Sequence, residues 1–245
     1  MGLEDLTQLE IIQNVISVIS TSIYIIVGVI IIAKYIKYKR KELLTVGFYV
    51  IFLTSSRWAT NIMFILYLLF DFDMSANLYI FICFGTIPFL VFFAYYTWGN
   101  LLYPKWAKKI TLITIVTGIL YVIFFVILLF TYPSLIGERV ARFDLTAGVY
   151  VLLYILITSV IGTVFIAHIY INALKSEKES IHWKGRFILI AWLTYIIGSF
   201  FDAALPLNIV LLIITKVVFI SSAILNYIGW VMPDKVLKWL TKKKG

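Results

Sequence analysis

Seven long apolar runs constrain the fold of this chain more than any other feature of its sequence. They lie near residues 12–33, 43–70, 78–102, 110–131, 145–172, 187–204 and 207–231. A helix of about 20 residues crosses the roughly 30 Å hydrocarbon core of a bilayer, and a helix satisfies its own backbone polar groups there. The runs therefore predict an all-α, polytopic membrane protein built as a seven-transmembrane helix bundle.

Composition supports a lipid environment. Of the 245 residues, 62% are hydrophobic and 13% are charged, whereas a soluble domain is about 45–50% apolar and about 25% charged. A soluble core of this size could not hide that much apolar surface. We expect a short extracellular N-terminus (1–11), the bundle (12–231) and a basic, amphipathic cytoplasmic tail (232–245).

The basic residues indicate the direction of the bundle. Seventeen of the 21 lysines and arginines follow runs one, three, five and seven, in segments 34–41, 105–109, 175–186 and 235–244. Cytoplasmic loops of membrane proteins are enriched in lysine and arginine. The sequence thus predicts an N-terminus outside and a C-terminus inside a cell membrane. Because the topology signal accounts for most of the positive charge, we do not expect nucleic acid as a partner.

Of the four other basic residues, Arg139 and Arg142 fall in a link on the opposite side, and two lie within the runs themselves. Lys216 lies within LLIITKVVFISS (211–222), and Arg57 lies within TSSRWATN (54–61). At 1.5 Å per residue both are near the middle of their runs, where a charge costs about 2.5–3.5 kcal/mol on insertion scales. The nearest candidate counter-charge is Asp202, at the outer end of the sixth run, if the lysine side chain extends outward.

Two interpretations of these cations stay open. They could point into a water-filled crevice, capped by hydroxyls such as those of Thr215, Ser55 and Ser56, or form the positive floor of a pocket for a small polar or anionic ligand. Pro88 removes a backbone donor in the middle of the third run and predicts a kink there, which can make room for a ligand. The candidate ligand-binding residues are Lys216, Arg57, Asp202, Thr215 and Pro88.

Catalysis is not expected. A membrane hydrolase needs paired carboxylates, a nucleophile beside a base, or a metal centre, and none of these lies at membrane depth. One cysteine and two histidines leave too few ligands for a metal site. We therefore predict a protein that is not an enzyme, with no catalytic residue, no metal and no required cofactor.

Two resemblances to known families bear on function. A lysine in the seventh helix, with the aromatic segment WLTY (192–195), is similar to the retinal-binding lysine of microbial rhodopsins, which would imply retinal on Lys216. The third run, however, has no acid to act as the Schiff-base counter-ion. The final segment, GWVMPDKVLKWL, resembles the end of seven-helix sensor modules of prokaryotic histidine kinases, in which it leads into a cytoplasmic signalling domain. Because this chain stops at Gly245, we expect any output to pass through a separate cytoplasmic partner.

Several function classes remain open at this point. We favour a receptor-like protein or sensor with a mid-membrane pocket near Lys216 and Arg57. The alternatives are an anion or small-molecule transporter or channel, a non-catalytic subunit of a membrane complex that binds a cytoplasmic partner on its basic face, and a retinal-binding photoreceptor.

Overall fold

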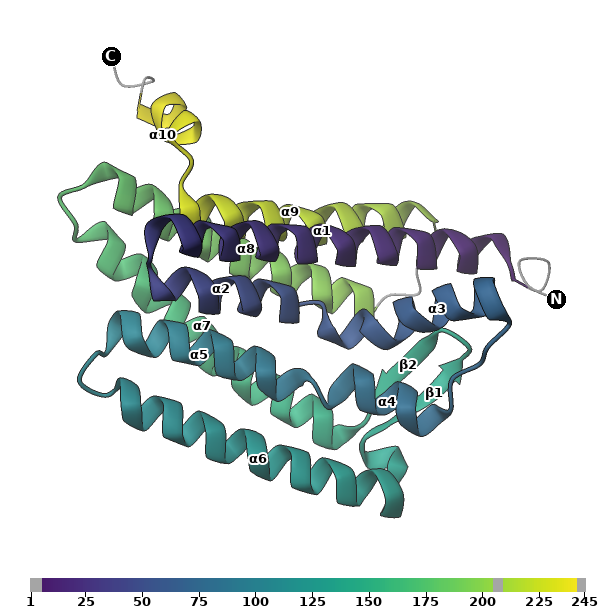
Figure 1. Ribbon diagram of the computed structural model, residues 1–245. Helices are drawn as coiled ribbons and strands as arrows, with labels where there is room; N and C mark the ends of the chain where they lie inside the picture. The colour runs from purple at the N-terminus through teal and green to yellow at the C-terminus, as the bar shows by residue number, and fades with distance from the viewer. Residues whose placement is uncertain (1–5, 205–208, 242–245) are drawn as a thin grey trace.

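The computed structural model describes residues 6–204 and 209–241, which form an elongated helical bundle (Figure 1). Its elements, in chain order, are α1 (Gln8–Tyr38), α2 (Lys41–Phe52), η2 (Ser55–Arg57), α3 (Trp58–Phe70), α4 (Ala76–Phe84), α5 (Ile87–Leu102), α6 (Ala107–Thr131), η3 (Pro133–Leu135), β1 (Gly137–Ala141), β2 (Asp144–Ala147), α7 (Val149–Leu174), α8 (Glu179–Ala204), α9 (Ile209–Val231) and α10 (Asp234–Thr241).

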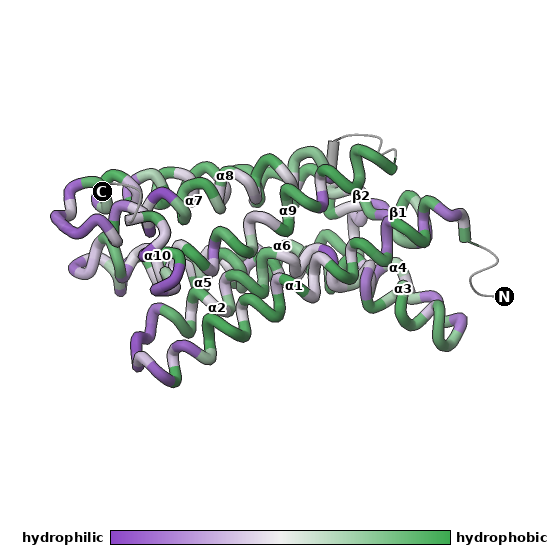
Figure 2. Tube along the Cα trace, turned by 90° about the horizontal axis from the view of Figure 1, so that it is seen from above, coloured by the Kyte–Doolittle hydropathy of each residue, from purple (hydrophilic) through white to green (hydrophobic). Residues whose placement is uncertain are grey.

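The described residues contain six helical segments that are long and apolar enough to cross a membrane. They are Gln8–Tyr38, Ala76–Leu102, Ala107–Thr131, Val149–Leu174, Glu179–Asp202 and Ile209–Val231. The most hydrophilic stretches of the chain gather at the two ends of the bundle, and the helices between them are mostly hydrophobic (Figure 2). The helical, multi-pass membrane architecture expected from the sequence is thereby confirmed.

The second expected span, 43–70, is not one continuous helix. It consists of α2, the short turn η2 and α3, and neither α2 (12 residues) nor α3 (13 residues) is long enough alone to cross a bilayer. The cause is local, because Thr54, Ser55 and Ser56 follow one another, and hydroxyl side chains compete with the helical backbone bonds. The Thr54 hydroxyl donates to the Ile51 carbonyl at 3.0 Å.

A second interruption separates α4 from α5. Pro88 stands in the first turn of α5, and the chain leaves helical geometry just before it. Proline has no N–H to donate to the carbonyl four residues earlier, which is that of Phe84. The Tyr121 hydroxyl of α6 donates to this carbonyl instead, at 3.2 Å. The sequence predicted a kink at Pro88, and the structure shows the break on its N-terminal side.

A short hairpin departs from the purely helical expectation. Strands β1 and β2 pair antiparallel between α6 and α7, so the fifth span begins at Val149 rather than near residue 145. Arg139 anchors the hairpin, because its guanidinium donates to the Met74 carbonyl at 2.9 Å and forms an ion pair with Asp73 at 2.8 Å. The sequence also predicts a tight turn at Pro206 between the sixth and seventh runs, and this residue lies outside the described part of the chain.

Two glycines allow α1 and α2 to pack with their backbones close together. A Cβ atom on Gly28 would lie 2.7 Å from the carbonyl oxygen of Gly47, and a Cβ on Gly47 would lie 2.7 Å from that of Gly28. Small residues at such crossings are the usual basis of close helix association in membranes. Helix α1 also packs along α9, so it joins the second span to the last one (Figure 1).

The α1–α2 contact gives a testable expectation. Gly28→Ala forces the two backbones apart and lowers the unfolding temperature of the detergent-solubilised protein by several degrees, because overpacking costs about 1–3 kcal/mol. Gly118→Ala is the matched control, since a Cβ there meets only the Pro88 Cβ at an ordinary 3.4 Å. Equal unfolding temperatures for the two variants would contradict the close approach.

Candidate functional site

The charged residues that the sequence places within the spans meet in one cluster. The Asp202 carboxylate accepts from the Lys216 ammonium through Oδ1, at 2.6 Å, and forms an ion pair with the Arg57 guanidinium through Oδ2. Three of the five candidate residues are therefore in direct contact. We refer to Arg57, Asp202 and Lys216 as the ion cluster.

Each member of the ion cluster comes from a different part of the fold. Arg57 ends the turn η2, so the interruption of the second span sets its position. Asp202 lies in the last turn of α8, and Lys216 lies seven residues into α9, about 10 Å along the helix axis. Helices α8 and α9 pack against each other along their length. The ion cluster thus connects the second, sixth and seventh predicted spans.

Burial makes this arrangement energetically demanding. The side chains of Lys216 and Asp202 are 6% and 9% exposed, and that of Arg57 is 28% exposed. Removing charges from water costs several kcal/mol per ion, which only good pairing geometry offsets. With all three groups ionised, the ion cluster has one negative and two positive charges. One unit of positive charge is left over, and Arg57 is the member most open to its surroundings.

The backbone next to the ion cluster is held by a side chain from α8. Tyr195 donates its hydroxyl to the Leu53 carbonyl at 3.0 Å, at the point where α2 ends. Leu53, Thr54 and Ser55 are all buried. Irregular backbone at membrane depth is tolerated where the protein satisfies its polar groups. Sequence reasoning missed this role of Tyr195, because no local pattern links it to residue 53.

The other two candidate residues have different positions. Thr215 is buried in α9, but consecutive helical residues do not share a face, so it does not face the same side as Lys216. Pro88 packs toward Gly118 of α6. Neither residue has a contact with the ion cluster among the interactions described above, and their predicted ligand-binding role stays a prediction.

Polar side chains near the ion cluster hold helices together. The Asn61 amide donates to the Thr21 hydroxyl at 2.7 Å, which links α3 to α1. Tyr24 of α1 donates to the Phe219 carbonyl of α9 at 2.8 Å, and Ser222 of α9 donates to the Ala191 carbonyl of α8 at the same distance. These bonds fit the expectation that hydroxyl residues of membrane helices support close helix contact.

The two described cavities lie away from the ion cluster. The larger, of about 560 Å³, runs between α5, α6 and α7, and the smaller, of about 330 Å³, lies beside Trp183 and Arg186. No member of the ion cluster lines either of them. In the described part of the chain, His, Cys, Asp and Glu side chains do not gather in groups of three that could hold a metal ion.

No family model matches the chain, and no curated protein matches it significantly. The residues of the site themselves therefore indicate its function.

The ion cluster predicts a particular order of stabilities. Asp202→Asn leaves two buried cations without an anion and should lower the free energy of unfolding by about 3–5 kcal/mol. Lys216→Met should cost less, because Asp202 keeps Arg57 as its partner. The double variant should regain part of the loss of Asp202→Asn, since only one cation then lacks its partner.

Thermal unfolding of the detergent-solubilised variants, followed by tryptophan fluorescence, measures this order. Asp73→Asn is the control, because Asp73 is 54% exposed in its ion pair with Arg139 and such pairs contribute about 0–1 kcal/mol. Strictly additive effects in the double variant would show that Lys216 and Asp202 do not interact.

Proposed function

We propose that this chain is a non-enzymatic, receptor-like membrane sensor that binds a small anionic or polar ligand at the ion cluster. The observation that carries the proposal is the buried arrangement of two cations around one carboxylate at an interrupted span. Ionisable groups inside a membrane are costly and usually serve a function. A ligand carboxylate or other anion would neutralise the positive charge that Asp202 leaves uncompensated.

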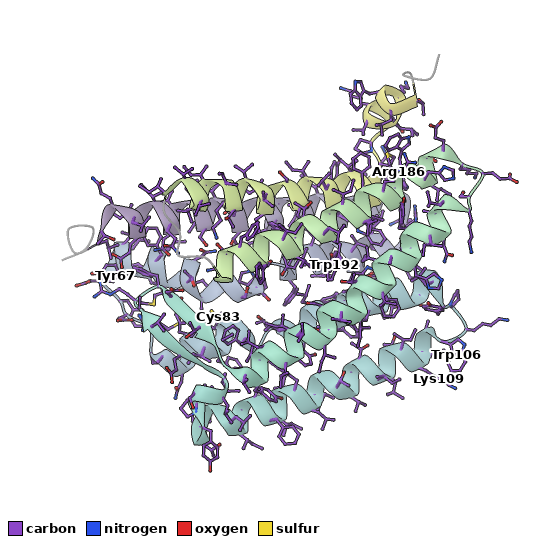
Figure 3. All side chains as sticks on the ribbon, turned by 180° about the vertical axis from the view of Figure 1, so that it is seen from behind. Tyr67, Cys83, Trp106, Lys109, Arg186 and Trp192 are labelled. Carbon is purple, nitrogen blue, oxygen red and sulfur yellow. The ribbon has the colours of Figure 1, made fainter. Side chains whose placement is uncertain are left out.

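The proposed topology has seven crossings, with the N-terminus outside and the C-terminus in the cytoplasm. Three pieces, α2, η2 and α3, would together make the second crossing. In support, Trp106, Lys109 and Arg186 lie toward one end of the bundle and Tyr67 toward the other (Figure 3). The end with Lys109 and Arg186 also carries the basic links 34–41 and 175–186, as expected for a cytoplasmic face.

A signal could pass along α8 and α9. Asp202 holds α9 through Lys216 and the second span through Arg57. An anion that competes with Asp202 for Arg57 would weaken the connection between the second span and the α8–α9 pair. Because a ligand shifts a conformational equilibrium only through different affinities for the two states, this competition supplies the required difference. A partner protein on the basic face would then receive the change.

An anion transporter is the second candidate. The observation in its favour is that the second and third spans are both discontinuous and that η2 contacts both α4 and α5. Discontinuous helices often line the substrate site of secondary transporters. Under this alternative Arg57 and Lys216 would guide an anion across the membrane rather than report its presence.

Topology can be tested by labelling single cysteines in intact cells. Cys83 is buried, and a Cys83→Ser background removes it. Ser134→Cys should react with a membrane-impermeant maleimide in intact cells, whereas Ser176→Cys should react only after permeabilisation. Both residues lie in links, at opposite ends of the bundle. Labelling of both cysteines in intact cells would contradict a membrane crossing by α7, the helix between them.

Ligand binding can be tested with acetate, phosphate and sulfate as probes. If one of them binds, tenfold excess over its Kd should stabilise the purified wild type by about 1.4 kcal/mol, seen as a higher unfolding temperature. Arg57→Gln should lose this response. Arg142→Gln is the control, because Arg142 stacks over Tyr67 and lies outside the ion cluster.

The outcomes separate the candidate functions. Stabilisation of the wild type without anion flux in proteoliposomes supports a receptor, and flux that Arg57→Gln abolishes supports the transporter. Identical responses of the wild type and Arg57→Gln to all three anions would overturn an anion site at the ion cluster.

A further inference from the structure

The larger cavity is a groove between α6 and α7 whose floor is formed by α5. Both helices pack against α5, and they contact each other through Tyr121 on α6 and the side chains of Tyr150 and Tyr154 on α7. The groove has a volume of about 560 Å³, within the range of small-molecule sites. Its walls run from Ile110 to Phe124 on α6 and from Tyr150 to Phe165 on α7, which corresponds to about 20 Å along the helix axes. An occupant of this groove must be elongated.

The groove opens toward lipid. Residues along both walls expose large apolar side chains, including Ile113 (62% exposed) on α6 and Leu153 (53% exposed) on α7. All 16 residues that line it are uncharged. A fatty acid or a phospholipid headgroup would therefore find no countercharge there. These features favour a neutral molecule that enters from the hydrocarbon core.

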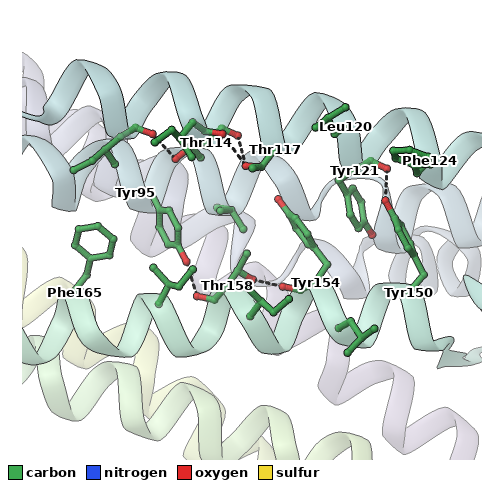
Figure 4. Close-up of a pocket in the computed structure, with 16 residues that line it drawn as sticks. Tyr95, Thr114, Thr117, Leu120, Tyr121, Phe124, Tyr150, Tyr154, Thr158 and Phe165 are labelled. Atoms are coloured by element: carbon green, nitrogen blue, oxygen red, sulfur yellow. Dashed lines mark hydrogen bonds between the residues drawn. The ribbon is translucent and has the colours of Figure 1, made fainter.

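Tyrosines cluster toward one end of the groove (Figure 4). The Tyr121 ring stacks on that of Tyr150, with centroids 5.3 Å apart, and lies 4.1 Å from that of Tyr154. Phe124 lines the same end. Aromatic side chains interact well with flat, conjugated groups through offset and edge-on contacts. This end of the groove suits a planar ring better than a saturated chain.

One hydrogen-bond donor in this cluster is left unused. Tyr150 donates to the Tyr121 carbonyl at 3.0 Å, and Tyr95 donates to the Thr158 carbonyl at 2.6 Å. Tyr121 bonds the Phe84 carbonyl at the interruption before Pro88. The Tyr154 hydroxyl, in contrast, is buried with no hydrogen-bond partner among the described residues, and it points across the groove toward α6 (Figure 4).

A buried hydroxyl without an acceptor is unfavourable, because no water replaces the lost bond in a membrane. The threonine hydroxyls of the groove already donate within their own helices, as Thr114 and Thr117 do to the Ile110 and Ile113 carbonyls. An occupant that offers an acceptor to Tyr154 would satisfy this last donor.

We propose that the α6–α7 groove binds a neutral, elongated lipid whose planar, carbonyl-bearing ring accepts a hydrogen bond from Tyr154 and whose apolar tail extends toward Ile110 and Phe165. Long-chain quinones have this chemistry. The site is separate from the ion cluster, so it goes beyond the function proposed above. It would give the protein a second, membrane-borne ligand.

The test uses the full chain in lipid nanodiscs and decylubiquinone, a quinone with a ten-carbon tail, as the probe. Binding is followed as saturable quenching of tryptophan fluorescence, because Trp98 contacts Phe165 at the far end of the groove. Tyr154→Phe removes only the free hydroxyl and should weaken binding about five- to tenfold. Tyr24→Phe is the control, because it removes a tyrosine hydroxyl outside the groove, one that bonds the Phe219 carbonyl, and it should leave the affinity unchanged.

Two further arms locate the site and test the acceptor. Leu153→Trp, at a lipid-exposed position, should fill the groove and abolish saturable quenching without lowering the unfolding temperature. Decylbenzene has a similar tail but no acceptor. Its affinity, measured by competition with the quinone, should be weak and the same in the wild type and in Tyr154→Phe.

Three results would overturn the proposal. They are non-saturable quenching in the wild type, equal affinities of the wild type and Tyr154→Phe for the quinone, and saturable binding that survives Leu153→Trp. None of them depends on anion binding at the ion cluster.

Discussion

The sharing of one buried carboxylate by two cations is the interaction on which the rest of this structure depends. Asp202 paired with only one cation, Lys216 or Arg57, would form an ordinary ion pair. Together the three groups join α8, α9 and the second predicted span at a depth where unpaired charge is very costly. The arrangement also leaves one positive charge in excess, and this excess makes the ion cluster a candidate for ligand binding rather than a purely structural connection.

The interrupted helices follow the same physical rule as the ion cluster, since a carbonyl at each of the two interruptions is given a partner. Tyr195 bonds the carbonyl at the end of α2, and Tyr121 bonds the carbonyl that Pro88 cannot serve. Both donors are tyrosines from neighbouring helices. Among the buried polar atoms without a partner in the described residues, the Tyr154 hydroxyl is the one that belongs to a lining residue of the groove, which makes it a place for an external acceptor.

The helical bundle could be predicted from the sequence because apolar run length and the need to satisfy backbone groups leave few alternatives. Lys216, Arg57 and Asp202 were also identifiable, since charges within apolar runs are conspicuous. The β1–β2 hairpin was not predicted, because contacts of Arg139 outside the hairpin hold it. The break at Thr54–Ser56 was not predicted either, because its three hydroxyl residues act together with the bond from Tyr195 to the Leu53 carbonyl. The α6–α7 groove was missed for the same reason, as its lining comes from three helices with ordinary apolar periodicity.

The most direct test of the ion cluster is a solid-state NMR measurement of the dipolar coupling between lysine ¹⁵Nζ and aspartate ¹³Cγ in lipid bilayers. Among the described residues, the lysine–aspartate ion pair is that of Lys216 and Asp202, while the other ion pairs involve arginine. The ion cluster predicts a strong coupling in the wild type that disappears in Lys216→Met. A wild-type spectrum without this coupling would contradict the ion cluster and the function built on it.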